Sequence, residues 1–366
     1  MSSELLPELG CYLLAGGALS PAPLPQEVRD AEGIGLGAAF ISERYNVKEA
    51  ATLAGAAGAA SSTIGLATAA TNHNSRHPLV TASMATTMHR LTGGRFALGL
   101  GRGIAPLQAA YGLAPITTAQ LEDMAGVLRR LFRGEAIFGH EGPIGSYPVL
   151  HLDSSFDEDV PLLLVAFGPQ TLALAGRAFD AVVLHTFFSD ETTARAVATV
   201  RRAADEAGRD PAAVRIWSCF ATVPDSLPDE VRLKRTVGRL ATYLQGYGDL
   251  LVATNGWDPE VLERFRADEV VASVPGAIDV LADTATLEHI GGLFPEAWLA
   301  AAATGDDASC AAAVAAQFDL GVDGVIMHGS APAELAGVTA AYRELPRPAA
   351  SARWSTHPLN PGARRV

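Results

Sequence analysis

Polar or glycine-rich clusters stand directly after several short apolar segments of this sequence. They are Glu43-Arg44-Tyr45, Thr71-Asn72-His73-Asn74, Gly101-Arg102-Gly103, Phe167-Gly168-Pro169-Gln170 and Thr186-Phe187-Phe188. If the apolar segments are parallel strands, the clusters meet at one end of the sheet, where barrel enzymes build their active sites. The sequence therefore predicts one composite site at the strand ends.

Gly168-Pro169 has the residue types that begin a helix directly after a strand. The unpaired N–H groups and the positive dipole end of a first helical turn favour a phosphate, and proline is preferred there. We therefore predict a phosphate-binding turn at Gly168-Pro169, with His185 and Thr186 on the adjacent strand end as companions. An ordinary strand-to-helix turn is the alternative.

Gly101-Arg102-Gly103 would allow the backbone to approach a flat ring system closely, and Arg102 could offset negative charge on it. The turn is not a dinucleotide fingerprint, because the required six-position glycine spacing at the head of the first helix is absent. The sequence also has no phosphate-cradling loop that ends in Lys-Ser/Thr.

Glu43 and Arg44 could position or protonate a substrate, and a surface ion pair is the alternative. His73 and His77 are four residues apart, but no carboxylate accompanies them in what reads as a loop. We therefore predict no metal site; His77, before Pro78, is expected to cap a helix, and His73 could line the pocket.

Eight apolar segments alternate with longer amphipathic or Ala-rich segments, which is typical of βαβ units. The predicted strands are 9–15, 37–42, 63–70, 95–100, 160–166, 180–185, 213–221 and 322–327. The predicted helices are 25–33, 47–60, 78–92, 117–133, 170–178, 190–208 and 333–344. Continuous apolar strands indicate a sheet covered on both faces. We therefore predict an α/β fold, a single (β/α)₈ TIM barrel.

Two insertions and a tail complete the expected organisation. Residues 134–157 follow the fourth helix and are expected to form a hairpin or loop at the barrel mouth. Residues 224–318 follow the seventh strand and are expected to be helical, as is the Ala-rich stretch 300–316. The barrel domain would span 1–347, with a loosely ordered tail over 348–366.

Composition narrows the function classes. The chain has 366 residues, a net charge of −13 and three scattered cysteines. The acidic balance argues against a nucleic-acid partner, and the cysteines are expected to be small buried hydrophobes. The sequence has no uninterrupted stretch of 18 apolar residues, so we predict no membrane span. No signal or transit peptide is visible, so we expect a cytoplasmic protein.

Three segments carry a family resemblance: TIGLATAATNHNSRHPLVTASMATTMHRLTGGRFALGLGRG from residue 63, VAFGPQTLALAGRAFDAVVLHTF from residue 165, and CAAAVAAQFDLGVDGVIMHG from residue 310. In this order they resemble the bacterial-luciferase-like family of luciferase-like monooxygenases and F420-dependent oxidoreductases. The resemblance implies hydride transfer between coenzyme F420 and a small-molecule substrate. An FMN-dependent monooxygenase is one alternative, and a non-catalytic flavin- or deazaflavin-binding protein is another.

The resemblance also implies site residues and an assembly. Glu43 and Arg44 would be catalytic, although Arg44 stands where some relatives carry His, which favours charge stabilisation over acid catalysis. A non-proline cis peptide is expected at Ala67-Thr68, and a homodimer is expected. The implied cofactor-binding residues are Thr68, Ala70, Thr71, Gly101, Arg102, Gly103, Ala166, Phe167, Gly168, Pro169, Gln170, His185 and Thr186.

Overall fold

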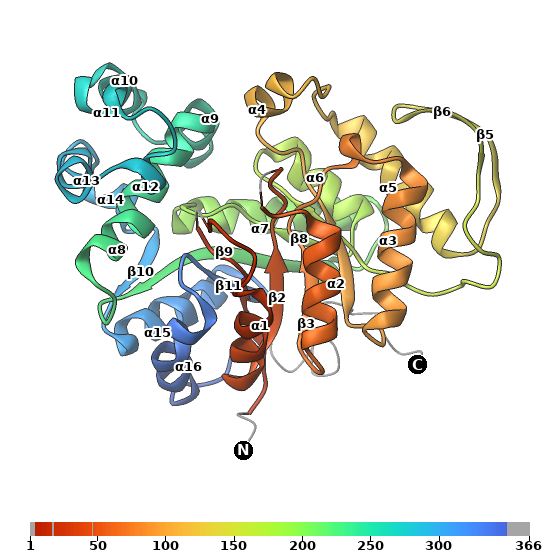
Figure 1. The fold of residues 1–366 in the computed structure, drawn as a ribbon, viewed down its shortest axis with the longest axis horizontal. Coiled ribbons are helices and arrows are strands. Elements are labelled where there is room, and N and C mark those ends of the chain that lie inside the picture. The colour runs from red at the N-terminus through yellow and green to blue at the C-terminus, as the bar shows by residue number, and fades with distance from the viewer. Residues whose placement is uncertain (1–3, 17, 46, 350–366) are drawn as a thin grey trace.

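Eight parallel strands close into a barrel in the computed structural model, which describes residues 4–16, 18–45 and 47–349. The barrel strands are β1 (Leu6–Tyr12), β2 (Leu36–Ile41), β3 (Gly65–Thr68), β4 (Phe96–Leu100), β7 (Leu162–Val165), β8 (Ala181–Val183), β9 (Arg215–Pro224) and β11 (Gly324–His328). They pair in this order around the ring, and β11 closes it against β1. The predicted (β/α)₈ TIM barrel is confirmed, and its carboxyl ends face the top of Figure 1.

Helices between the strands cover the outside of the barrel (Figure 1). They are α1 (Leu24–Gly33), α2 (Ala50–Ala60), α3 (Pro78–Leu91), α5 (Thr118–Phe132), α6 (Pro169–Ala178), α7 (Asp190–Glu206), α15 (Asp307–Ala316) and α16 (Ala336–Arg343). The short helix α4 (Ala105–Ala110) lies above the carboxyl ends of the strands, at the top of Figure 1. Polar side chains set several helix starts by accepting orphan backbone N–H groups. Thr117 and Gln120 form a capping box at α5, and Ser189 caps α7. His77 caps α3 by accepting the N–H of Leu79, as predicted.

The barrel interior is filled by two large rings and many small side chains. Trp217 and Phe40 are fully buried, with ring centroids 5.1 Å apart in an edge-to-face arrangement. The space around them is taken by alanines such as Ala38, Ala67 and Ala97. The interior is therefore a packed core and not a channel, as is usual for this barrel.

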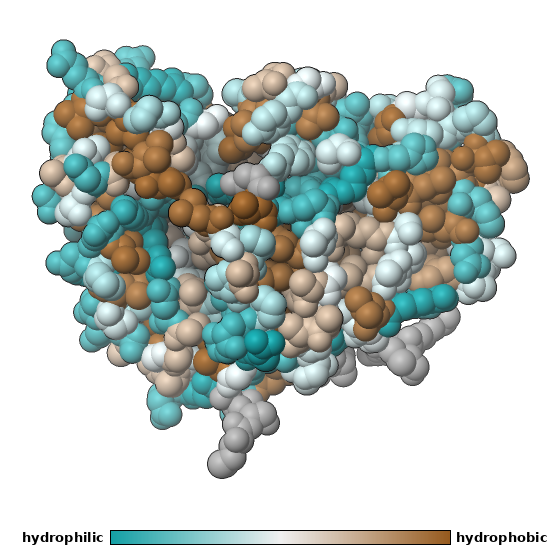
Figure 2. All heavy atoms as spheres, in the orientation of Figure 1, coloured by the Kyte–Doolittle hydropathy of each residue, from teal (hydrophilic) through white to brown (hydrophobic). Residues whose placement is uncertain are grey.

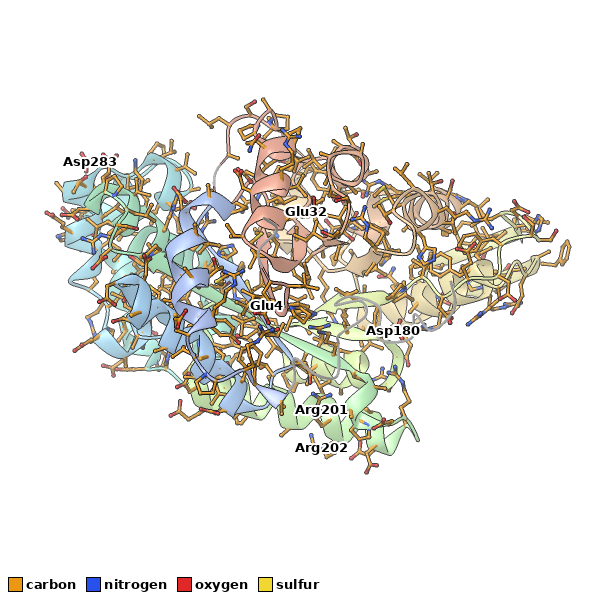
Figure 3. The ribbon with its side chains drawn as sticks, turned by 90° about the horizontal axis from the view of Figure 1, so that it is seen from below. Glu4, Glu32, Asp180, Arg201, Arg202 and Asp283 are labelled. Carbon is orange, nitrogen blue, oxygen red and sulfur yellow. The ribbon has the colours of Figure 1, made fainter. Side chains whose placement is uncertain are left out.

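Ion pairs gather at the amino-terminal end of the barrel. Figure 3 views the molecule from this side and labels Asp180 and Arg201 there. Arg201 pairs with the buried Asp323 at 2.6 Å, and Asp180 pairs with Arg129 at 3.1 Å. These pairs tie helices to strand starts on the face opposite the predicted site.

The insertion over 134–157 forms an antiparallel hairpin of β5 (Ile137–Gly142) and β6 (Gly145–Leu150). The predicted hairpin is thus present. His140 contacts Asp123 of α5 at 3.2 Å, and the Tyr147 ring packs on His77 at the start of α3. The chain leaves α5 at the amino-terminal end of the barrel, and the hairpin runs along the outside of α3 and α5 toward the starts of these helices, so that its turn lies on the side of the carboxyl ends of the strands (Figure 1).

The second insertion begins within β9, which is longer than its neighbours. Residues 215–221 of β9 pair within the barrel, and Ala221–Pro224 pair with β10 (Ala302–Gly305). We expected 302–305 to be helical, and this was wrong, because these residues add a parallel strand to β9. The N–H of Asp225 donates to the carbonyl of Gly305 at 2.7 Å, so the insertion leaves and returns at one point.

Short helices fill the insertion between these ends, at the left of Figure 1. They are α8 (Asp229–Leu233), the π-helical segment η3 (Lys234–Gly238), α9 (Arg239–Asn255), α10 (Pro259–Ala267), α11 (Glu269–Ser273), α12 (Ile278–Leu281), α13 (Thr284–Gly291) and α14 (Glu296–Leu299). Three-residue or four-residue 3₁₀ turns are η1 (His73–Ser75), η2 (Pro211–Ala213), η4 (Gln317–Leu320) and η5 (Pro332–Leu335). α15 belongs to the barrel wall, so the insertion proper is shorter than the 224–318 we expected.

The cysteines Cys11, Cys219 and Cys310 are free and buried, as predicted. No helix within the described ranges is long and apolar enough to span a bilayer. The predicted tail over 348–366 lies, from residue 350 onward, outside the described residues.

Candidate active site

A non-proline cis peptide joins Ala69 and Ala70, directly after β3. Our prediction of Ala67-Thr68 placed it two residues too early. Ala70 is half-buried at the carboxyl end of the barrel, which we call the mouth. A Cβ atom on Gly101, after β4, would lie 2.7 Å from the Cβ of Ala70. A side chain at position 101 would therefore collide with that of Ala70, which favours glycine there.

The turn after β7 forms an open cradle at the start of α6. Gly168 is the N-cap residue, and no side chain caps this helix. A Cβ atom on Gly168 would meet only the Leu250 side chain, at 4.0 Å. Within the described chain, the N–H groups of Gly168 and Gln170 donate to no protein acceptor. Space, free donors and the helix dipole together suit a phosphate group.

Aromatic side chains from three elements meet beside this cradle. The Phe167 ring, after β7, lies 4.4 Å from that of His185, after β8. Tyr243 and Tyr247 of α9 contact His185 at centroid distances of 4.8 and 5.2 Å. Arg239, Tyr243 and Tyr247 are spaced by four residues, so α9 presents them on one face. The cluster forms a half-buried aromatic wall of the mouth.

Two hydrogen bonds fix the protonation pattern of this wall. The His185 Nδ1 lies 2.7 Å from the carbonyl oxygen of Thr186, so Nδ1 carries the proton. Its Nε2 then accepts a hydrogen bond from the Tyr247 hydroxyl at 2.8 Å. Burial lowers the pKa of His185 to about 4 and raises the pKa of Tyr247 well above 10. The pair is therefore neutral at physiological pH, with the phenol as donor.

Tyr12 and His328 lie on the neighbouring side of the mouth, at the ends of β1 and β11. The Tyr12 hydroxyl donates to the carbonyl oxygen of Ala69 at 2.9 Å, and its ring meets His328 edge-on at 5.3 Å. The buried Nδ1 of His328 has no hydrogen-bond partner within the described chain. Burial and nearby cations hold the pKa of His328 well below its usual value. His328 is thus a neutral imidazole with unused hydrogen-bonding capacity.

Glu43 faces away from the mouth. Its side chain is 1% exposed and forms a bidentate ion pair with Arg76, and it also accepts a hydrogen bond from the Thr71 hydroxyl. Arg76 also pairs with Glu49, the N-cap residue of α2. Glu43 therefore orders the loops after β2 and β3. Arg44 is exposed, and its guanidinium forms no ion pair with any described carboxylate.

The remaining predicted residues fall into two groups. Ala70, Phe167, Gly168 and His185 come together at the mouth, flanked by the exposed Pro169, Gln170 and Gly103. Thr68, Thr71, Ala166 and Thr186 are buried, and the three threonine hydroxyls are hydrogen-bonded within the protein; that of Thr68, for example, bonds the Gly99 backbone. Arg102 turns to the Thr118 hydroxyl at the start of α5.

Several residues of this site were not singled out from the sequence. His328 directly follows the predicted strand 322–327, so the rule that selected the other clusters could have found it. Tyr12 lies inside the predicted strand 9–15 and was missed because β1 ends at Tyr12, earlier than predicted. Tyr243, Tyr247 and Arg239 lie in the insertion, where only their spacing of four residues carried a signal. Lys48, in the loop after β2, donates to the carbonyl oxygen of Leu14 after β1, and no sequence signal indicated this contact.

The rim of the mouth is apolar over α4. Ile104, Leu107 and Tyr111 are 42%, 45% and 55% exposed, and Tyr111 packs edge-on against Tyr45. Figure 2 shows hydrophobic side chains at this upper edge of the molecule. The rim could therefore contact the apolar body of a ligand that enters the mouth.

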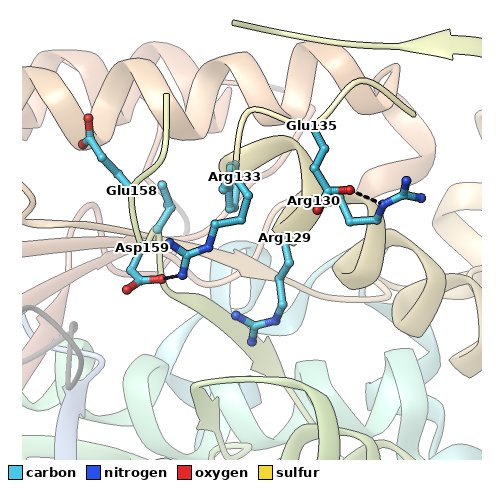
Figure 4. Close-up of a pocket in the computed structure, with 8 residues that line it drawn as sticks. Arg129, Arg130, Arg133, Glu135, Glu158 and Asp159 are labelled. Carbon is cyan, nitrogen blue, oxygen red and sulfur yellow. Dashed lines mark hydrogen bonds and ion pairs between the residues drawn. The ribbon is translucent and has the colours of Figure 1, made fainter. Parts of the chain in front are cut away.

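A separate surface hollow lies at the other end of the barrel. It is lined by Arg129, Arg130, Arg133, Glu135, Glu158 and Asp159, among others (Figure 4). These residues end α5 or precede β7, so they lie at the amino-terminal ends of the strands. Arg130 pairs with Glu135 and Arg133 with Asp159 across it. The charges of the hollow are thus already matched, and the hollow is not part of the mouth.

The barrel fold is shared by known proteins. A 5,10-methylenetetrahydromethanopterin reductase of Methanolobus tindarius is 28% identical over 234 residues, which cover 63% of this chain and 69% of that protein. The coenzyme F420-dependent tetrahydromethanopterin reductase of Methanopyrus kandleri superposes with a TM-score of 0.74 at 21% identity, over 93% of this chain and 98% of that one.

A second solved structure is an F420-dependent secondary alcohol dehydrogenase in complex with an F420-acetone adduct. It superposes with a TM-score of 0.69 at 17% identity, over 94% of this chain and 100% of that one. The sequence profile of the luciferase-like monooxygenases matches residues 4–324. The relatives with matching sequence are named reductases, and we conclude that this chain is an oxidoreductase of the luciferase-like monooxygenase family.

Proposed function

We propose that the protein transfers hydride between coenzyme F420 and a small organic substrate. The observation that carries this proposal is the adjacency of two surfaces at the mouth. The Ala69-Ala70 backbone offers a small, flat support for a ring, and the open Gly168 cradle on a nearby strand end offers donors for a phosphate. A ring joined to a phosphate-bearing tail needs both surfaces.

In this proposal the N–H groups of Gly168 and Gln170 would hold the cofactor's phosphate, and Ala69-Ala70 would support its ring. The deazaflavin supplies the hydride chemistry when bound. Phe167 and the aromatic wall exclude water from one side. The substrate oxygen would be met by polar groups that remain neutral, namely the imidazole of His328 and the phenol of Tyr247.

Glu43 and Arg44 take different roles. The Glu43 carboxylate is saturated by Arg76 and Thr71, so we assign it to positioning the two loops and not to proton transfer. Arg44 is exposed and has no carboxylate partner, which suits stabilisation of negative charge.

An FMN-dependent monooxygenase remains the second candidate, because the family profile that matches is that of luciferase-like monooxygenases. Both cofactors carry a flat ring and a phosphate, so the cradle alone suits either. A non-catalytic binding protein is disfavoured because the relatives reported above are named reductases. A homodimer in the cytoplasm completes the proposal.

Titration of the apoprotein with coenzyme F420 and with FMN, followed by fluorescence, ranks these candidates. We expect saturable binding of F420 and at most weak binding of FMN. Tight binding of FMN without a response to F420 would favour the FMN-dependent monooxygenase over the F420-dependent enzyme. If neither cofactor bound, the proposal that the mouth is a cofactor site would be refuted.

A further inference from the structure

Two cations, those of Lys48 and Arg239, converge on the loop that follows β1, and Arg44 lies beside Lys48 in the loop after β2. Lys48 is only 2% exposed, and its ammonium group donates hydrogen bonds to the carbonyl oxygens of Leu14 and Gly16, the latter at 3.3 Å. A guanidinium nitrogen of Arg239, from α9, lies 3.3 Å from where a Cβ on Gly16 would be. The backbone N–H of Arg44 donates to the carbonyl of Lys48 at 2.8 Å, which holds the two residues side by side, and the Arg44 charge acts on Lys48. Lys48, Arg239 and the neighbouring Arg44 thus add positive charge to one side of the mouth.

The carboxylates nearby only partly balance this charge. Asp279 pairs with Arg239 at 2.7 Å. Glu27 of α1 accepts the N–H of Leu14 and acts on Lys48 from a distance. Among the described carboxylates none forms an ion pair with Lys48 or with Arg44. The cluster therefore holds more positive than negative charge before any ligand binds.

The positive charges of these residues lower the pKa of Lys48 itself and of the nearby His328. Burial, together with the charges of Arg44 and Arg239, lowers the pKa of Lys48 to about 8, while Glu27 opposes that shift. Arg239, Arg44 and Lys48 also help to lower the pKa of His328. All three cations are thus close enough to act on a residue at the heart of the mouth. A bound anion would relieve this repulsion.

We infer that this side of the mouth, formed by Arg44, Lys48 and Arg239 beside His328, binds an anionic oxygen group of the substrate, a carboxylate or a phosphate. The inference rests on the proposed function for the chemistry and adds the substrate class to it. Tyr12 bridges the two halves of the mouth, since it bonds Ala69 and contacts the His328 ring. The reacting carbon would lie near that bridge, with the anionic group toward the cations.

The test compares anions with neutral analogues of the same shape on the apoprotein in a chloride-free buffer. Calorimetry with lactate against lactamide examines a carboxylate, and glycerol 3-phosphate against glycerol examines a phosphate. We expect one anion to bind at least tenfold more tightly than its neutral partner at pH 7. The preference should shrink as the pH rises through about 8, because Lys48 then loses its proton while the two arginines stay charged.

Arg44→Gln is the decisive variant because the side chain is exposed, whereas a change at Lys48 could disturb the loop after β1. It should lower the anion preference about tenfold, and the control Arg29→Gln, exposed on α1, should leave it unchanged. Equal binding of anion and neutral partner, or an unchanged preference in Arg44→Gln, would overturn the inference. F420 binding is measured separately, so a failure of the proposed cofactor and a failure of the anion subsite are told apart.

Discussion

Two substitutions at Gly168, Gly168→Asn and Gly168→Asp, should stabilise the protein and weaken cofactor binding at the same time. Gly168 caps α6 with extended backbone angles, φ −90° and ψ 167°, which every residue type adopts without strain. The new side chain would meet only Leu250 at van der Waals distance. In Gly168→Asn the side-chain oxygen would accept the free N–H of Gln170, as N-cap residues do. That is the donor we assign to the cofactor phosphate.

The two effects can be sized separately. An aspartate N-cap adds a few tenths of a kcal/mol over glycine, and its charge adds about 0.3–1 kcal/mol at the helix dipole. Loss of a hydrogen bond to a charged group costs about 1.5–3 kcal/mol, or roughly 10- to 100-fold in Kd. Repulsion between the new charge and a phosphate about 5.5 Å away is about 3 kcal/mol at an effective dielectric of about 20, before screening by salt.

We therefore expect Gly168→Asn to weaken F420 binding roughly 10- to 100-fold, and Gly168→Asp to weaken it by at least another factor of about ten. Urea unfolding should give a higher midpoint for the aspartate variant, and fluorescence titration should give the affinities. Gly126→Asn, on the exposed face of α5 with nothing within 4 Å, is the control and should leave affinity unchanged. Equal affinities of the aspartate and asparagine variants would refute a phosphate at this turn.

Three further outcomes follow from the described contacts. Trp217→Ala should lower the free energy of unfolding by about 3–5 kcal/mol, measured by denaturant titration, because the barrel interior cannot collapse around so large a loss. Arg76→Gln should cost about 3–5 kcal/mol by leaving the buried Glu43 charge unpaired, whereas Arg90→Gln, in an exposed pair, should cost under about 1 kcal/mol; similar losses would contradict this. Because the folded-state pKa of His185 lies below its unfolded value, stability should fall as the pH drops from about 6.5 to about 4, and His185→Gln should flatten this part of the pH–stability curve.

The strand pattern made the barrel predictable. Continuous apolar segments between amphipathic ones allow few architectures, and all eight barrel strands were anticipated. β10 was missed because Ala302 and Ala303 suit a helix as well as a strand, and only pairing with the end of β9 decides between them. The hairpin was anticipated, but its packing on α3 and α5 depends on His77 and Asp123, which lie outside it, and no local signal reports those contacts.

The site was predictable only where it lies on barrel strands. Gly168 and His185 follow strands and were found by position. Glu43 was also found by its position after a strand. The orientation of its side chain is set by the ion pair with Arg76, which lies 33 residues later in the sequence, and no local sequence pattern indicates that pair. Tyr247 reaches the mouth only because the insertion folds back over the barrel.

The hydrogen bond between Asp225 and Gly305 gives the insertion the geometry of an exchangeable part. Its two ends meet on the barrel, so its internal length can change at little cost in chain entropy to the rest of the protein. Arg239, Tyr243 and Tyr247 all belong to this part, whereas Gly168 and Ala70 belong to the barrel. Changes confined to the insertion could thus alter one side of the mouth, while the other side of the mouth and the packed interior of the barrel stay unchanged.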